Sequence, residues 1–317
     1  MLKKCLILLF ALLLFLFLLF NNRNFPVEKD SYLGWDVRRF QTTKAWELAK
    51  AIEDNDLQEI KHQVIDLKVP VDTRDRINDF TPWMFAVFNN NIQSVKALLD
   101  LGADPNLPND SISDKGDNSV IIASRYSDIS IEILKLLLKY GGNPNSTECG
   151  RNYDMDGDWI PARSSALSCA VSISGEIEKV KILVEAGANV NNYDGDFQDA
   201  PLMDALLLDR MNIALYLLEH GADYNYKFRS CAPSSGGGSR DVDILYRLRQ
   251  CIYPLDSQEY KDKLKVIKFL KDRGVDYRKS LVDVETKKMI NNVMHFKTYK
   301  EYQNYGSSGI WSDNLMK

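Results

Sequence analysis

LLDLGADPN, at residues 98–106, is the stretch that decides the fold, because the chain repeats it in three near-copies. The copies are LLKYGGNPN ending at Asn145, LVEAGANVN ending at Asn191 and LLEHGADYN ending at Asn225. Leu98 and Leu99 close an apolar stripe that begins at Ile92 and Val95, and this spacing places all four on one helical face. Gly102 then suits the left-handed backbone conformation that ends many helices. Each copy therefore predicts an amphipathic helix, a glycine stop and a tight turn.

A second signature precedes each stripe at a similar period. The stop glycines are Gly102, Gly141, Gly187, Gly221 and Gly274, with spacings of 39, 46, 34 and 53 residues. The segments TPWMFA, NSVIIA, SALSCA and APLMDA end at Ala86, Ala123, Ala170 and Ala205. Each begins a shorter first helix and places a small residue where two helices touch. The repeating unit is thus predicted to be a pair of helices followed by a turn.

This pattern resembles the ankyrin repeat, which has roughly 33 residues, a T-P-L-H-x-A opening and two antiparallel helices followed by a β-turn. Thr81-Pro82 matches the opening well and Ala200-Pro201-Leu202 matches it fairly, but the family's His is absent from every copy. The resemblance covers residues 44–279. It implies an all-α ankyrin-repeat solenoid of about six units. The connections between repeats, which we call fingers, would project from one edge.

Both ends of the array are predicted to be degenerate caps, because a terminal repeat needs one solvated face. Residues 45–72 align with the first clear repeat at an offset of 35, which gives Leu57, Ile60 and Val64 stripe positions. Leu67 then falls where the stop glycine stands. In the last copy Lys271 stands where leucine belongs. Residues 280–317 are expected to form a helical cap and tail.

The amino-terminal segment differs in kind from the array. Two lysines precede 16 uncharged apolar residues, Cys5–Phe20, which as a helix would span about 24 Å. No small-residue cleavage site follows the apolar run, so we expect residues 1–22 to form an uncleaved signal-anchor, with a cleaved signal peptide as the alternative. Lys3 and Lys4 favour an orientation that places the repeats on the periplasmic or extracellular side of the membrane. Residues 23–43 would be the tether.

Cysteine spacing suggests two disulfides. Cys149 and Cys169 are 20 residues apart, as are Cys231 and Cys251, and an exported compartment permits disulfides. The alternative is a set of small thiols without bridges.

The sequence offers little chemistry for catalysis. The three histidines, His62, His220 and His295, are scattered, and no zinc-protease, serine-hydrolase or paired Cys-x-x-Cys motif is present. The glycine-rich stretch at residues 231–241 lacks the lysine of a phosphate-binding loop. The net charge of −4 does not favour nucleic acid as a partner. We therefore predict no catalytic, cofactor or metal site.

The fingers give the main functional lead, because aromatic residues supply most interface binding energy and charges steer encounter. Two fingers carry such residues: Tyr153, Asp154, Asp156, Asp158 and Trp159 in one, and Tyr193, Asp194, Asp196 and Phe197 in the next. Metal binding by the alternating aspartates is a weaker interpretation, since Gly157 falls one place early for an EF-hand loop. The concave helix face around Phe85, Phe88 and Tyr126 is the alternative surface.

These features predict a non-enzymatic protein-binding module, displayed outside the cytoplasm on an inner or plasma membrane tether. Acidic fingers suit a basic protein partner. Bacterial ankyrin proteins with this layout include periplasmic immunity proteins that block a secreted toxin, so an immunity or inhibitor role is the first expectation. A membrane-tethered scaffold or stress-related accessory factor is the alternative.

Overall fold

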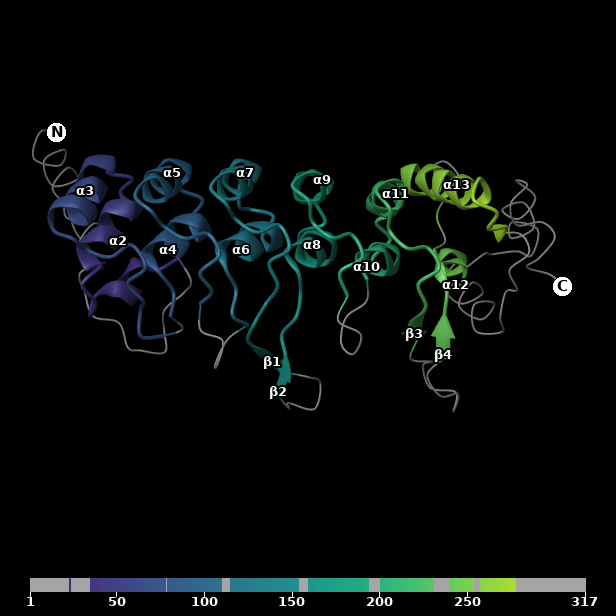
Figure 1. Ribbon diagram of the computed structural model, residues 1–317, viewed down its shortest axis with the longest axis horizontal. Helices are drawn as coiled ribbons and strands as arrows, with labels where there is room; N and C mark the ends of the chain where they lie inside the picture. The colour runs from purple at the N-terminus through teal and green to yellow at the C-terminus, as the bar shows by residue number, and fades with distance from the viewer. Residues whose placement is uncertain are drawn as a thin grey trace, which may run out of the picture. The chain divides into compact units, whose positions relative to one another are not determined.

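A computed structural model describes residues 23, 35–77, 79–109, 115–153, 159–193, 200–230, 240–251, 253 and 257–277. These residues form two compact units, one ending at Ala162 and one beginning at Arg163. Each unit is built from pairs of helices joined by fingers (Figure 1). The predicted ankyrin-type helical fold is confirmed in both.

Unit 1 holds two rows of helices, and its fingers leave from the side of one row (Figure 1). We call that row the finger-side row and the other the far row. The finger-side row contains α2 (Trp46–Glu53), α4 (Pro82–Phe88) and α6 (Ser119–Arg125). The far row contains α3 (Leu57–Lys61) continued by the π-helix η3 (His62–Asp66), then α5 (Ile92–Asp100) and α7 (Ile131–Lys139). A short 3-10 helix, η2 (Val37–Phe40), precedes α2.

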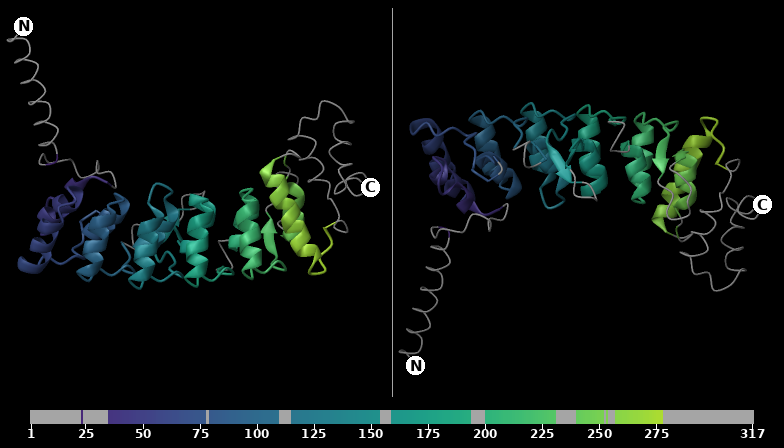
Figure 2. Two further views of the ribbon diagram at one scale, coloured as in Figure 1. Left: turned by 90° about the horizontal axis from the view of Figure 1, so that it is seen from above. Right: turned by 90° about the horizontal axis from the view of Figure 1, so that it is seen from below.

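Unit 2 repeats the arrangement. Its finger-side row contains α8 (Ala166–Cys169) with the π-helix η4 (Ala170–Ser174), then α10 (Pro201–Leu207) and α12 (Ile244–Gln250). Its far row contains α9 (Ile177–Glu185), α11 (Met211–Glu219) and α13 (Gln258–Lys271). Seen from above and below, the helices of each unit lie side by side (Figure 2).

Local chemistry explains where the helices begin and end. The side chains of Thr81, Asn118 and Ser165 accept hydrogen bonds from the third amide of α4, α6 and α8, respectively, which satisfies donors that the helix leaves unpaired. Gly102 and Gly141 adopt φ angles of +95° and +90°, as the stop positions require. The stripes are buried at their centres: Val95, Leu98, Leu134, Leu137, Val180 and Leu183. Ile92, at the edge of its stripe, is 39% exposed.

Asparagine side chains join neighbouring turns within each unit, a role that the sequence pattern did not reveal. In unit 1, the Asn106 amide donates to the carbonyl of Gly141 (3.0 Å) and accepts from the backbone N–H of Asn143 (2.7 Å). In unit 2, Asn191 makes the same two bonds to Gly221 (3.0 Å) and Asp223 (2.8 Å). We call this paired interaction the asparagine clamp. The clamp is made by the asparagine that ends the recurring nine-residue stretch, Asn106 in one copy and Asn191 in another.

The predicted tether at residues 23–43 is wrong for its described part, because residues 35–43 pack onto the array. Val37 and Phe40 are 2% and 0% exposed, and the Phe40 ring lies edge-on to Phe85 at 5.7 Å. Arg23 bonds the carboxylates of Glu53 and Asp54 at 3.1 and 2.8 Å. Apolar burial therefore draws this segment into the first repeat.

The first repeat also corrects the predicted glycine position. The π-helix η3 adds one residue to the end of the far-row helix, so the left-handed position passes from Leu67 to Lys68, whose φ is +57°. The turn after it, closed by Thr73 N–H donating to the carbonyl of Pro70, matches the turn from Asp104 to Leu107. The alignment offset thus falls from 35 in the helix to 34 in the turn.

Two fingers contain strands as well as turns, which the all-α prediction did not anticipate. In unit 1, β1 (Arg151–Tyr153) pairs antiparallel with β2 (Trp159–Pro161), with Asn152 opposite Ile160. In unit 2, β3 (Phe228–Ser230) pairs antiparallel with β4 (Arg240–Val242). The enlarged fingers are long enough to satisfy part of their backbone as hairpins.

No helix among the described residues is long and apolar enough to cross a membrane. Residues 1–22 and 280–317, where we predict a signal-anchor and a helical tail, lie outside the described residues. Lys271 is exposed beside the buried Leu270, as expected of a terminal repeat with one solvated side.

The last repeat buries a lysine. The Lys263 ammonium donates to the carbonyl of Cys251 at 2.6 Å and lies 5.7 Å from the Tyr277 ring, on which the Arg249 guanidinium stacks at 4.0 Å. Burial lowers the pKa of Lys263 to about 7 from its ordinary 10.5. Burial also raises the pKa of the Cys251 thiol to about 12.

This lysine should make unit 2 more stable as the pH rises from 7 to 9. Over that range the unfolded lysine holds a proton that the folded one has released, so the free energy of unfolding should rise by up to about 1.4 kcal/mol per pH unit. The Cys251 thiol opposes this trend only above its ordinary pKa of 9.0. Urea denaturation of the wild type and Lys263→Met should show a steeper pH dependence for the wild type. Equal slopes would contradict the assignment.

Candidate functional site: the fingers and aromatic surface of unit 1

The bases of the second and third fingers of unit 1, residues 102–117 and 142–162, are joined by backbone hydrogen bonds. Gly150 N–H donates to the carbonyl of Lys115 at 2.8 Å, which links one finger to the next. Within each finger, Asn109 N–H donates to Asp117 and Ala162 N–H donates to Gly150. These two fingers therefore lie side by side, as the repeat pattern predicts.

A buried arginine at the end of α6 bonds the bases of both fingers. The Arg125 guanidinium, at the end of α6, bonds both carboxylate oxygens of Asp117 in the second finger and one oxygen of Glu148 in the third. The three side chains are 5%, 10% and 3% exposed. Burial of charge is favourable only when the partners and geometry are good, so this Arg125 cluster fixes the position of both fingers relative to α6.

A second buried arginine, Arg39, holds the first finger, residues 68–80, by an ion pair with Asp75. Arg39 donates to the Asp75 carboxylate at 2.5 Å and its guanidinium lies 4.2 Å from the Phe80 ring. Asp75 in turn accepts from the N–H groups of Ile77 and Phe80. Neither arginine was predicted as a site residue. Arg125 ends an apolar segment, a signal that does not by itself identify its partner, and Arg39 lies in a polar stretch that gives no such signal.

An aromatic series lies beside these finger bases. Phe80, Phe88 and Tyr126 pack edge to face in sequence, with ring centroids 6.1 and 5.2 Å apart. Tyr126 is 37% exposed and Phe88 is half-buried, so both can contact another molecule. Phe85, which we predicted on the same surface, is 0% exposed. It belongs to the core because it packs on Phe40, and its assignment as a contact residue is wrong.

The predicted finger residues are only partly described. Tyr153 and Trp159 are backbone partners across the β1–β2 hairpin. Tyr193, in unit 2, is 46% exposed and packs edge-on against Tyr226 at 4.8 Å. Outside the described residues lie Asp154, Asp156, Asp158, Asp194, Asp196 and Phe197. Their part in binding therefore stays a prediction.

The predicted disulfides are not formed in this structure. Cys149, Cys169 and Cys251 are thiols, and Cys231 lies outside the described residues. The Cys149 sulfur lies 3.4 Å from the carbonyl of Gly116, and the Cys251 sulfur lies 3.4 Å from that of Leu206. The Cys149 and Cys251 thiols are thus directed at nearby backbone acceptors.

In the described parts of both units, no group of three or more His, Cys, Asp or Glu side chains has an arrangement that could hold a metal ion. His62 bonds Asp66 at 2.9 Å on an exposed helix surface, and that bond raises the pKa of the imidazole. His220 stacks on Tyr216 and bonds its backbone carbonyl, which is a local structural role.

Comparison with known proteins agrees with this architecture. A family model described as "Ankyrin repeats (3 copies)" matches residues 48–148 and 149–228. Among solved structures, an ankyrin repeat domain from Acinetobacter baumannii AYE is 25% identical, with a TM-score of 0.52 over 72% of this chain and 97% of that one. The ankyrin repeat domain of Bcl-3, described as a unique member of the IkappaB family, is 21% identical, with a TM-score of 0.50 over 73% and 86%. No curated protein matches the sequence.

The family model covers more than half of the chain, in register with the helix pairs and turns described above. The chain therefore belongs to the ankyrin-repeat family, whose domains are typically non-catalytic modules that bind other proteins.

Proposed function

We propose that this chain binds a protein partner through the finger-side surface of unit 1, with Tyr126 and Phe88 as its aromatic anchors. The observation that carries the proposal is the half-exposed Phe88–Tyr126 pair beside finger bases that two buried arginines hold in place. Exposed aromatic rings on a rigid support contribute strongly to protein interfaces, because little conformational entropy is lost on binding.

The acidic residues of the finger sequences favour a basic partner. Residues 189–204 contain four acidic residues and neither lysine nor arginine. Charges at the rim of an interface mainly raise the association rate. This charge pattern supports an immunity or inhibitor protein that neutralises a secreted basic protein, which is the role we favour. Location outside the cytoplasm on a membrane anchor is part of the same proposal and rests on the apolar run Cys5–Phe20.

A capture experiment with the full chain tests the proposed surface. Tyr126→Ala should weaken capture of the partner by about tenfold or more, as expected for an aromatic hot spot. Ile92→Ala is the matched control, because Ile92 is similarly exposed, at 39%, but lies on the far row. Equal capture by wild type and Tyr126→Ala would exclude Tyr126 as an anchor, and the absence of any specific protein partner would contradict the proposed function.

A charge variant tests the fingers separately. Changing Asp154, Asp156, Asp158, Asp194 and Asp196 to asparagine should slow association with the captured partner at low salt without unfolding the repeats. Unchanged association kinetics would reject the finger hypothesis while leaving the aromatic surface intact.

A further inference from the structure

The junction between the first two turns of unit 1 lacks the asparagine clamp. The turn alignment places Asp72 where the clamp at the next turn has Asn106. A carboxylate has no N–H to donate to the carbonyl of Gly102, whereas the amide of Asn106 donates to Gly141. Among the described residues, neither the Gly102 carbonyl nor the Asp104 backbone N–H has a hydrogen-bond partner, and the Asp72 carboxylate accepts no bond.

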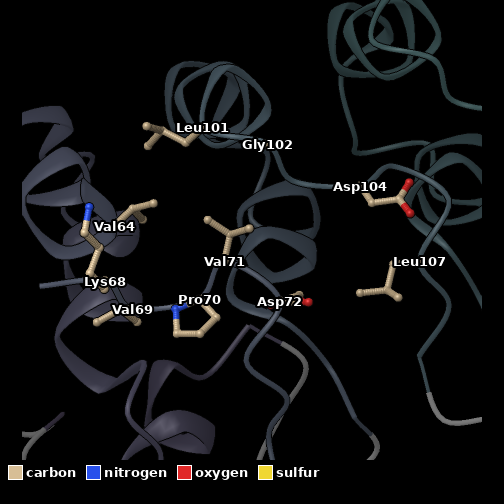
Figure 3. Close-up of a pocket in the computed structure, with 10 residues that line it drawn as sticks. All are labelled: Val64, Lys68, Val69, Pro70, Val71, Asp72, Leu101, Gly102, Asp104 and Leu107. Atoms are coloured by element: carbon tan, nitrogen blue, oxygen red, sulfur yellow. The ribbon is translucent and has the colours of Figure 1, made fainter. Parts of the chain in front are cut away.

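A pocket of about 430 Å³ opens at this junction (Figure 3). One side is formed by residues 64–72 and the other by residues 101–107. Its apolar lining comes from Val64, Val69, Pro70, Val71, Leu101 and Leu107, and its polar lining from Lys68, Asp72, Asp104 and Gly102. The Gly102 carbonyl and the Asp104 backbone N–H, whose counterparts are bonded at the clamped turns, are therefore available to a ligand here.

The lining selects the chemistry of that ligand. The lining carries two carboxylates, Asp72 and Asp104, and one ammonium, Lys68. This excess of negative charge favours a cation as the ligand. The Gly102 carbonyl, which has no hydrogen-bond partner, and the Asp72 carboxylate both require donors. A planar guanidinium can donate to two such acceptors at once. The apolar lining suits the methylene stem of a long basic side chain. We infer that this pocket binds an arginine side chain of the protein partner, an inference that rests on the proposed protein-binding function.

The inference can be tested on the full chain with methyl-labelled valine and leucine. The probe is N-acetyl-arginine methylamide, and the matched ligand control is the citrulline analogue, which has the same shape without the charge. The arginine probe should shift the methyl signals of Val71, Leu101 and Leu107, and the citrulline analogue should bind about tenfold more weakly, as loss of a charged hydrogen bond predicts. Equal binding of both probes, or shifts elsewhere only, would overturn the inference.

Three variants make the test specific. Asp72→Ala should weaken arginine binding by about tenfold because it removes an acceptor without adding a donor. Asp72→Asn should instead build the clamp with Gly102 and Asp104, which closes the pocket, abolishes arginine binding and raises the denaturation midpoint. Asp128→Asn removes the same negative charge as Asp72→Asn, at an exposed residue just before α7. This control variant should leave arginine binding unchanged. An unaltered affinity in both Asp72 variants would overturn the inference.

The partner assay separates this inference from the proposed function. If wild type and Asp72→Ala capture the partner equally and the arginine probe does not bind, the pocket assignment is wrong while protein binding stands. If the probe binds as expected but no protein is captured by any form of the chain, the proposed function is wrong and the pocket has another basic ligand.

Discussion

Arg125→Met should lower the free energy of unfolding of unit 1 by about 3–5 kcal/mol, because it leaves two buried carboxylates without their partner. Asp117 and Glu148 are 10% and 3% exposed at their side chains, so water can replace little of the lost interaction. Urea denaturation of the full chain, followed by circular dichroism and by the fluorescence of the buried Trp83 in the same unit, would measure the loss.

Two matched variants identify the cause. Arg125→Lys keeps the charge but loses the two-pronged contact with Asp117, so its cost should be smaller. Combining Arg125→Met with Asp117→Asn and Glu148→Gln should recover part of the stability, since the unpaired charges are then gone. If Arg125→Met cost less than about 1 kcal/mol, the cluster would be a solvated surface interaction instead.

Leu137→Ala should destabilise unit 1 by about 2–5 kcal/mol, through lost apolar transfer and the cavity that remains. Leu137 is 0% exposed in α7, at the centre of the second recurring stripe. Leu138→Ala is the control, because this neighbour is only half-buried and lies off the centre of the same stripe. The comparison uses the same urea titration, and similar small costs for both variants would mean that the stripe is not the centre of the repeat.

The regular part of this fold could be predicted from sequence because its causes are local. An apolar stripe, a capping residue and a stop glycine lie within one repeat, as Val95, Thr81 and Gly102 show. The tether was predicted wrongly because Val37 and Phe40 lie outside any copy of the repeat, yet they cover the first finger-side helices. Phe85 was misplaced because a short helix of almost wholly apolar residues does not show which face is exposed.

The interaction surface was less accessible to sequence analysis because its contacts join distant segments. Arg125 meets a carboxylate 8 residues before it and another 23 residues after it, separations that no periodic pattern encodes. The extra residue in η3 was also not evident, since the offset of 35 gives Leu57 and Ile60, which precede η3, their stripe positions. Only the turn geometry shows that Asp72, not Val71, takes the asparagine position.

The unclamped first junction also affects how the array would respond to load. In a linear array, neighbours hold one another by pairwise contacts alone, so the chain is no stronger than its least bonded seam. Because the turns at that seam lack the two clamp hydrogen bonds of the next one, tension applied from the amino-terminal side would separate these turns before those behind them. A partner that inserts a side chain there would supply the missing hydrogen bonds and thereby stiffen the amino-terminal end of the array.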